Sequence, residues 1–94
     1  DRPMSFDRHL TPHWRPGYRF QYEPAQKAHV LLYPEGMIKL NESAALIGEL
    51  IDGERDVTAI IALRDEKFPG VPELAEDIEQ FMEVARAEHW ISLE

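Results

Sequence analysis

The alternation of apolar and polar residues predicts strands in the first half of the chain. Residues 18–22 alternate aromatic and polar side chains, which is the period of a strand with one buried face. Two further runs with strand character cover residues 28–33 and 37–40, and only short connections separate the three runs. Short connections favour antiparallel neighbours, so these runs predict a three-stranded antiparallel sheet.

Three helices are predicted after the sheet, because apolar residues then recur at helical spacing. The first covers residues 44–51, with Asn41 or Ser43 as its N-cap, and Asp56 caps the second. Pro72 is expected in the first turn of the third helix, where a missing N–H is tolerated. The apolar stripe of this third helix consists of Leu74, Ile78, Phe81, Met82 and Ala85. The predicted fold class is therefore α+β, with a winged-helix-like order of sheet and helices.

Residues 1–15 are expected to form an extended or flexible arm, which leaves residues 16–94 as the folded domain. The arm contains several prolines, and proline is disfavoured in helices and in central strands. Two alternatives remain open for its apolar residues Phe6, Leu10 and Trp14: they pack on the domain, or they belong to a disordered tail.

The composition argues against nucleic-acid and membrane partners. The formal net charge is −8 over 94 residues, whereas nucleic-acid affinity depends largely on Lys and Arg. The longest apolar run covers residues 30–33, whereas a membrane-spanning helix needs about 20 apolar residues. The chain has no cysteine, which suits a reducing compartment, and we expect a cytoplasmic protein.

No arrangement of side chains in the sequence indicates catalysis, a cofactor or a metal. His9 and His13 have i, i+4 spacing, but Pro12 lies between them and a zinc site needs further ligands. The carboxylates of residues 73–83 recur every three or four positions, as on the solvent face of an amphipathic helix. The glycines match no phosphate-binding loop or dinucleotide motif. We therefore expect a binding protein that is not an enzyme.

Several segments resemble the PqqD proteins of pyrroloquinoline quinone (PQQ) biosynthesis, and their order and spacing match as well. The most characteristic is LLYPEGMIKLN at residues 31–41, which is similar to the family pattern L-Y-P-E-G-x-x-x-L-N. Further similar segments are IGELIDGERDV at residues 47–57, DIEQF at residues 77–81 and HWI at residues 89–91. His89 departs from the family pattern, in which glycine is common. The resemblance extends over nearly the whole chain.

This resemblance implies a peptide chaperone. PqqD proteins bind the precursor peptide PqqA and deliver it to PqqE, a radical SAM enzyme that joins a Glu and a Tyr side chain. Some members are fused to PqqC, the oxidase of the same pathway, which is a further implied partner. In this class the leader segment of the peptide adds as an extra strand beside the third strand, in a groove walled by the third helix.

The residues expected to form such a groove lie on the third strand and near the third helix. Strand hydrogen bonds return less free energy than the ordering of a flexible peptide costs, so buried apolar side chains are also required. Ile78 and Phe81 are expected mainly in the core, whereas the flexible thioether of Met82 suits a peptide surface. The candidate peptide-binding residues are Met37, Ile38, Lys39, Leu40, Val71, Leu74, Ala75, Ile78 and Met82.

Two other functions stay open from the sequence. The first is a docking or structural module of a larger enzyme, with Trp14 and Trp90 on the docking surface. The second is a winged-helix DNA-binding domain, which needs a basic recognition helix. The basic residues of the second predicted helix are offset by the neighbouring Asp65 and Glu66, which argues against DNA.

Overall fold

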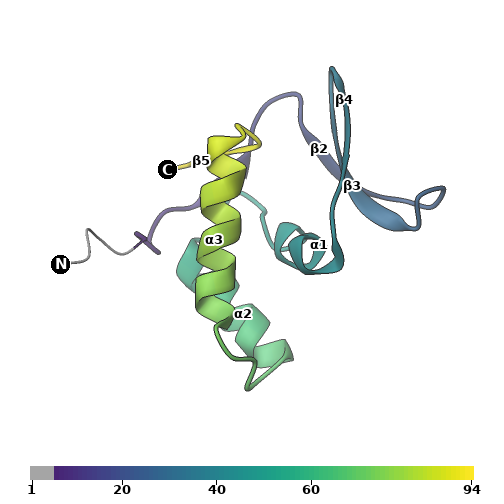
Figure 1. Ribbon diagram of the computed structural model, residues 1–94. Coiled ribbons are helices and arrows are strands. Elements are labelled where there is room, and N and C mark those ends of the chain that lie inside the picture. The colour runs from purple at the N-terminus through teal and green to yellow at the C-terminus, as the bar shows by residue number, and fades with distance from the viewer. Residues whose placement is uncertain (1–5) are drawn as a thin grey trace.

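The structure is a computed structural model that describes residues 6–94 as a small sheet beside three helices (Figure 1). The strands are β1 (Pro12–Trp14), β2 (Arg19–Glu23), β3 (Ala28–Tyr33), β4 (Gly36–Lys39) and β5 (Ile91–Leu93). The helices are α1 (Glu42–Gly48), α2 (Val57–Lys67) and α3 (Leu74–Ala87). This order confirms the predicted α+β class, in which a three-stranded antiparallel sheet precedes three helices.

The larger sheet has the strand order β2-β3-β4, so β3 lies in the centre and the other two strands form the edges. Both pairings are antiparallel, and one row across the sheet joins Phe20, Leu31 and Ile38. Alternation along the strands turns this row toward α1, where the Phe20 ring lies against Gly48. Strand β3 has the predicted bounds, whereas β2 and β4 are each shifted by one residue.

A second sheet of two strands joins the two ends of the described chain. Strand β1 pairs antiparallel with β5, and Trp14 lies opposite Ile91. Thr11 and Glu94 extend the pairing, because the N–H of each donates to the carbonyl of the other, at 2.9 and 3.1 Å. This sheet was not predicted, since strands of three residues show no clear period and Pro12 argued against a strand. Pro12 is tolerated because β1 is an edge strand.

The pairing of β1 with β5 holds residues 6–15 against the body of the domain. Phe6 and Trp14 pack against the hydrophobic core, and Pro12 is fully buried. Phe6 and Trp14 therefore follow the first of the two alternatives for the apolar residues of the arm. Residues 1–5 lie outside the described part of the chain, and the prediction for them stays a prediction.

Side-chain caps begin the first two helices. Asn41 accepts a hydrogen bond from the N–H of Ala44 at 2.7 Å, which decides between the two predicted N-caps of α1. Asp56 accepts one from the N–H of Ala59 at 2.8 Å, as predicted for α2. These bonds satisfy N–H groups that have no partner within a helix. Helix α1 ends at Gly48, earlier than the predicted range.

The third helix begins later than predicted. Helix α3 starts at Leu74, so Pro72 lies in the preceding turn and not in the first helical turn. Glu73 at the N-cap position has a φ of 60°, in the left-handed region that is unfavourable for residues other than glycine. From Leu74 onward the apolar stripe has the predicted helical spacing, so the error concerns only the turn before the helix.

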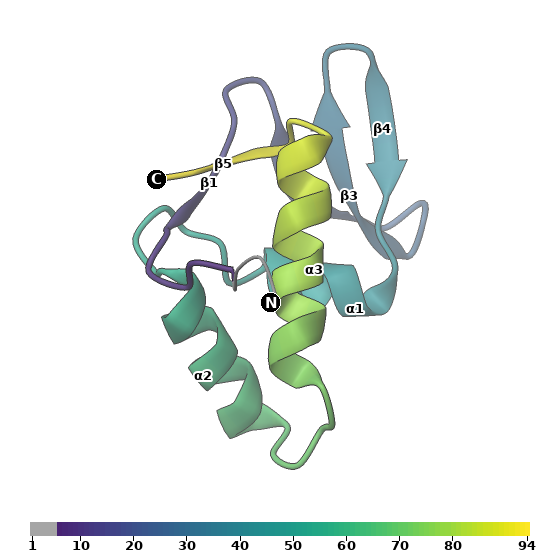
Figure 2. The same ribbon diagram turned by 60° about the vertical axis from the view of Figure 1, so that its left-hand side comes forward.

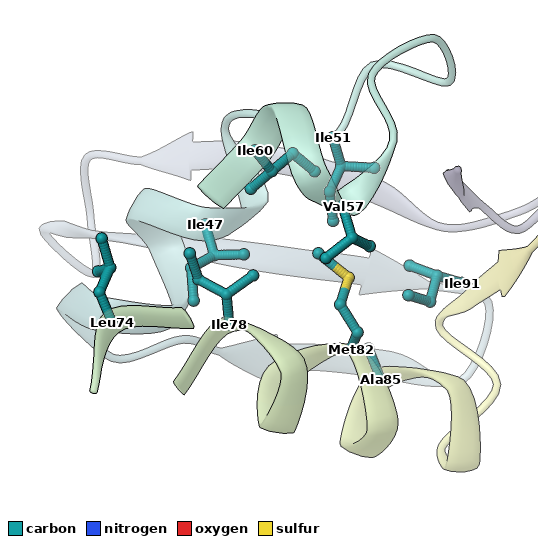
Figure 3. Packing of buried hydrophobic residues seen from close by; sticks show 9 residues of the cluster. All are labelled: Ile47, Ile51, Val57, Ile60, Leu74, Ile78, Met82, Ala85 and Ile91. Carbon is teal, nitrogen blue, oxygen red and sulfur yellow. The ribbon is translucent and has the colours of Figure 1, made fainter. Parts of the chain in front are cut away.

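The core joins the three helices to β5 (Figure 3). Its cluster of buried residues consists of Ile47, Ile51, Val57, Ile60, Leu74, Ile78, Met82, Ala85 and Ile91. The side chain of Met82 extends from α3 toward Val57 and has no exposed surface. No polar or charged residue is buried among residues 6–94. Apolar packing therefore fixes the position of α3 beside the other elements, which determines the shape of the site described next.

Neither a membrane span nor a metal site is found in the part of the chain that the structure describes. None of its helices combines the length and the apolar character that crossing a membrane requires. Its His, Asp and Glu side chains form no group of three or more that could hold a metal ion. His13 instead lies 3.8 Å from the carboxylate of Glu94, and His9 is exposed.

Candidate functional site

The outer edge of β4 carries backbone groups that face away from the sheet. The N–H of Leu40 donates to the carbonyl of His29 at 3.0 Å, so Leu40 faces the neighbouring strand. In an antiparallel ladder successive residues face alternate sides, which places the N–H and C=O groups of Met37 and Lys39 on the outer side. Within residues 6–94, β3 is the only strand that pairs with β4, so this edge is open.

A groove of about 540 Å³ lies beside this edge and is lined by residues of β4, α1 and α3. Figure 2 shows how these three elements are arranged, with β4 and α1 on the same side of α3. The strand wall and the turn after it contribute Ile38, Lys39, Leu40 and Asn41, and α1 contributes Ser43, Ala44 and Ile47. The helix wall consists of Asp77, Gln80, Phe81 and Val84, with Trp90 behind the end of α3. The groove therefore runs along the edge that an added strand would occupy.

The groove has a buried apolar floor and a partly exposed apolar wall. Leu40 and Ile47 belong to the floor, because their side chains are buried. Phe81 and Trp90 are half-buried, and Val84 is 46% exposed although it is apolar. A guest side chain placed here would lose apolar surface to solvent, which is the main source of favourable free energy on binding.

The predicted strand residues lie at the site, and three of them line the groove. Ile38, Lys39 and Leu40 belong to its lining. Met37 does not line it, but it contributes backbone groups to the open edge and its side chain is 44% exposed. Alternation turns the side chains of Met37 and Lys39 to the face of the sheet opposite that of Ile38.

The predicted residues on and before the third helix do not line the groove, and Met82, which was expected on a peptide surface, lies in the core. Met82, Ile78 and Leu74 are buried in the core. Ala75 and Val71 are not covered by the core, but they lie outside the groove lining. Met82 forms one margin of the core stripe of α3, and Ala75 lies beyond that margin. The groove residues of α3 lie beyond the opposite margin.

The sequence missed the helix wall because periodicity shows a buried stripe but not which flank faces a neighbouring element. Helical spacing treats the residues on the two sides of the buried stripe alike, so only the tertiary arrangement decides which side faces a neighbouring element. One signal was available in Val84. It is an apolar residue outside the stripe on an otherwise charged surface, and its exposure marks the flank that faces β4.

The two charged residues that line the groove have no ionic partner in the described part of the chain. The salt bridges among residues 6–94 join Arg8 to Glu79, Arg55 to Asp52, Arg86 to Glu83, His29 to Glu49 and His13 to Glu94. Lys39 and Asp77 line the groove and take part in none of these pairs. The charge of Asp77 is therefore available to a guest, whereas alternation along β4 turns the Lys39 side chain to the opposite face of the sheet from Ile38.

Comparison with known proteins gives a consistent set of relatives. The family model described as Coenzyme PQQ synthesis protein D (PqqD) matches residues 28–91. The PqqA binding protein of Pseudomonas fluorescens (strain Pf0-1) is 84% identical over 91 residues, covering 97% of this chain and 100% of that protein. PqqA binding protein 1 of Pseudomonas putida is 79% identical over 90 residues, with coverage of 96% and 99%.

A solved structure shares the fold. It is the solution NMR structure of the PqqD truncation of Methylobacterium extorquens PqqCD, which represents a recognition element for ribosomally synthesised and post-translationally modified peptides (RiPPs). The TM-score is 0.76 at 23% sequence identity, and the alignment covers 96% of this chain and 97% of that one. The two proteins therefore share the arrangement of sheet and helices described above.

Proposed function

Because the chain belongs to the PqqD family, we propose that it is a peptide chaperone that binds the precursor peptide PqqA and presents it to the radical SAM enzyme PqqE. Relatives of high identity carry the name PqqA binding protein, which supports the choice of peptide. The observation that carries the proposal is the open edge of β4 directly beside an apolar groove. An extended peptide that joins this edge would become a fourth strand of the larger sheet.

Backbone hydrogen bonds alone would not hold the peptide. Met37 and Lys39 offer about four outward groups, and four hydrogen bonds contribute ~2–6 kcal/mol net. Ordering a flexible peptide costs ~1–2 kcal/mol per residue, so a segment of about eight residues costs more than these bonds return. Each apolar side chain buried in the groove adds about 1.5–3 kcal/mol. The edge therefore sets the register of the guest, and the groove supplies most of its affinity.

The groove is suited to binding more than to catalysis. Its charged side chains, Lys39 and Asp77, are both exposed to solvent. Catalytic sites gain much of their electrostatic effect by excluding water, which a groove with exposed charges does not do. We therefore propose that the chemistry on the bound peptide is carried out by PqqE, and that PqqC is a further partner, as the PqqCD neighbour suggests.

The strand-addition step is tested by titrating labelled PqqA into the wild-type protein and the Lys39→Pro variant. Proline removes the outward N–H of Lys39 without removing a bond to β3, so the fold is expected to survive. We expect affinity to fall more than tenfold in Lys39→Pro and to stay near the wild-type value in Lys39→Gln, the control for the lost charge. Equal binding by Lys39→Pro and Lys39→Gln, with both variants folded, would contradict strand addition.

Delivery to the enzyme is tested separately, by following the Glu–Tyr cross-link that PqqE forms in PqqA. The Ile38→Asp variant places a charge in the groove and should abolish both peptide binding and the stimulation of cross-linking. Stimulation by a folded Ile38→Asp protein that no longer binds PqqA would show that the chain acts on PqqE without presenting the peptide.

A further inference from the structure

We propose that the groove selects its guest by charge as well as by shape, because Asp77 pairs with a basic side chain of the guest. The guest segment would carry this basic side chain and an apolar side chain on the same face of its strand, two or four residues apart. This inference rests on the proposed function, because it assumes that the peptide lies along β4. The groove would then prefer guest segments that carry this pattern of residues.

The two ends of the groove differ in chemistry. Both views show β4 beside the later turns of α3, with α1 further toward the start of α3 (Figures 1 and 2). Ile38, Val84 and Trp90 therefore form an apolar end. Asp77 lies in the first turn of α3, at the end where Asn41 also lines the groove. A guest that fills the groove meets apolar surface at one end and a carboxylate at the other.

Asp77 is the α3 carboxylate that both lines the groove and takes part in no salt bridge within residues 6–94, whereas Glu76, which is also unpaired, lies outside the groove lining. Glu79 forms an ion pair with Arg8, and Glu83 forms one with Arg86, both away from the groove lining. Asp77 is exposed, lines the groove and takes part in no salt bridge within residues 6–94. Its negative charge is thus directed to whatever occupies the groove.

Lys39 does not cancel this charge. Among residues 6–94 it is the only Lys or Arg that lines the groove, but alternation along β4 turns its side chain to the opposite face of the sheet from Ile38 and Leu40. The chain also carries a net charge of −8, which adds a field of the same sign as Asp77. A basic group is therefore the guest charge that this end of the groove favours.

The spacing follows from the geometry of the two elements. Asp77 and Val84 are seven positions apart on α3 (84 − 77), and a helix rises about 1.5 Å per residue, so they are separated by ~10 Å along its axis. A strand advances about 3.3 Å per residue and turns every second side chain to the same face. Two side chains on one face that bridge ~10 Å are therefore two or four residues apart.

The test is a double-mutant cycle between the protein and the PqqA peptide. The protein variants are Asp77→Asn and, as a matched control, Glu76→Gln, which neutralises an exposed carboxylate of the same helical turn outside the groove. The peptides are PqqA and variants in which each Lys or Arg is replaced in turn by Gln. Affinities are measured at low and at high salt, because screening weakens the interaction of exposed charges.

We expect Asp77→Asn to bind PqqA about two- to fivefold more weakly at low salt, as for a partly exposed ion pair, and Glu76→Gln to bind normally. One peptide variant should show the same loss with the wild-type protein and no further loss with Asp77→Asn. A Val84→Ser cycle with apolar-to-serine peptide variants then identifies the apolar partner, expected two or four residues from the basic one.

Three results would overturn the inference: wild-type affinity in Asp77→Asn, an equal loss for every peptide variant, or an odd spacing between the two coupled peptide residues. They are distinguishable from failure of the proposed function. If the wild-type protein does not bind PqqA, the proposed function fails. If it binds and Lys39→Pro abolishes binding while Asp77→Asn has no effect, only the charge recognition fails.

Discussion

At the scale of single residues, Gly48 shows how closely α1 approaches the sheet. A Cβ atom at this position would lie 2.7 Å from Cε1 of Phe20. The Phe20 ring is itself stacked between Trp14 and His29, with ring centroids 5.4 and 5.1 Å away, so it has little room to move. Only glycine therefore allows α1 to pack at this distance from the sheet.

We predict that Gly48→Ala lowers the free energy of unfolding. Alanine gains about 0.5–1 kcal/mol over glycine in a helix, but overpacking a tight contact costs about 1–3 kcal/mol. Urea denaturation should therefore show a net loss of up to about 2 kcal/mol. The loss should shrink in a Phe20→Leu background, which removes the contacting ring atom. A stabilised Gly48→Ala protein would show that the ring moves aside at little cost.

Asp52 gives a prediction about pH. Its pKa is held below the usual value of 3.8, first by the backbone N–H of Arg55 and then by that of Glu54, both of which donate to its carboxylate at 2.9 Å. A group with a lowered folded-state pKa contributes stability that is present above pH 3.8 and lost as the pH falls through the folded-state value. Asp52→Asn should therefore reduce the loss of stability on acidification below pH 3.8, measured by thermal unfolding against pH. If Asp52→Asn loses as much stability as the wild-type protein when the pH falls below 3.8, this role of Asp52 is contradicted.

At the scale of elements, the start of α2 depends on Asp56 and on the residues before β1. Asp56 caps the helix through Ala59, and the carbonyls of Leu10 and Arg8 accept hydrogen bonds from the N–H groups of Val57 and Thr58 at 3.0 and 2.9 Å. Three N–H groups that an isolated helix leaves unpaired are therefore satisfied.

We predict that Asp56→Ala costs about 1 kcal/mol of stability without changing the affinity for PqqA at a temperature where the protein is folded. The cap is remote from the groove lining, so only the folding equilibrium should respond. Asp65→Ala, an exposed position of the same helix, is the matched control and should have little effect on stability. A loss of PqqA affinity in folded Asp56→Ala would show that α2 is coupled to the groove.

The sequence predicted elements well where periodicity and capping are local properties. The period-2 pattern placed β2 to within one residue, the strand character of residues 28–33 placed β3, and the side chains of Asn41 and Asp56 placed two helix starts. It did not predict β1 and β5, because each has only three residues and forms by a contact between the two ends of the chain. The groove flank of α3 also escaped prediction, since helical spacing does not show on which side of the stripe β4 lies, and Val84 was the one signal for that side.

At the scale of the whole molecule, the described N-terminal residues lie where they leave the β4 edge free. Strand β1 pairs with β5 and not with the larger sheet. Lys39 on the edge itself discourages self-association, as charged residues do on edge strands. The fold therefore keeps one strand edge open beside an apolar groove, a combination that suits a guest chain.

Binding to this edge should stabilise the entire domain. A ligand at about 100 times its Kd adds about 2.7 kcal/mol to the free energy of unfolding, and each kcal/mol raises Tm by about 4–8 °C in a domain of this size. We therefore predict that saturating PqqA raises Tm by about 10–20 °C in the wild-type protein and by clearly less in the Lys39→Pro variant at the same peptide concentration, because tenfold weaker binding removes about 1.4 kcal/mol of this stabilisation. Calorimetry measures both, and equal shifts in the two proteins would place the peptide elsewhere.

The most direct measurement is amide hydrogen exchange, followed residue by residue with and without PqqA. The account predicts that the amides of Met37 and Lys39, which face outward from β4, become strongly protected when the peptide binds. The amide of Leu40 already donates to His29 and should change much less. Protection that develops on the outer edge of β2, or binding that leaves the amides of Met37 and Lys39 unprotected, would contradict the account.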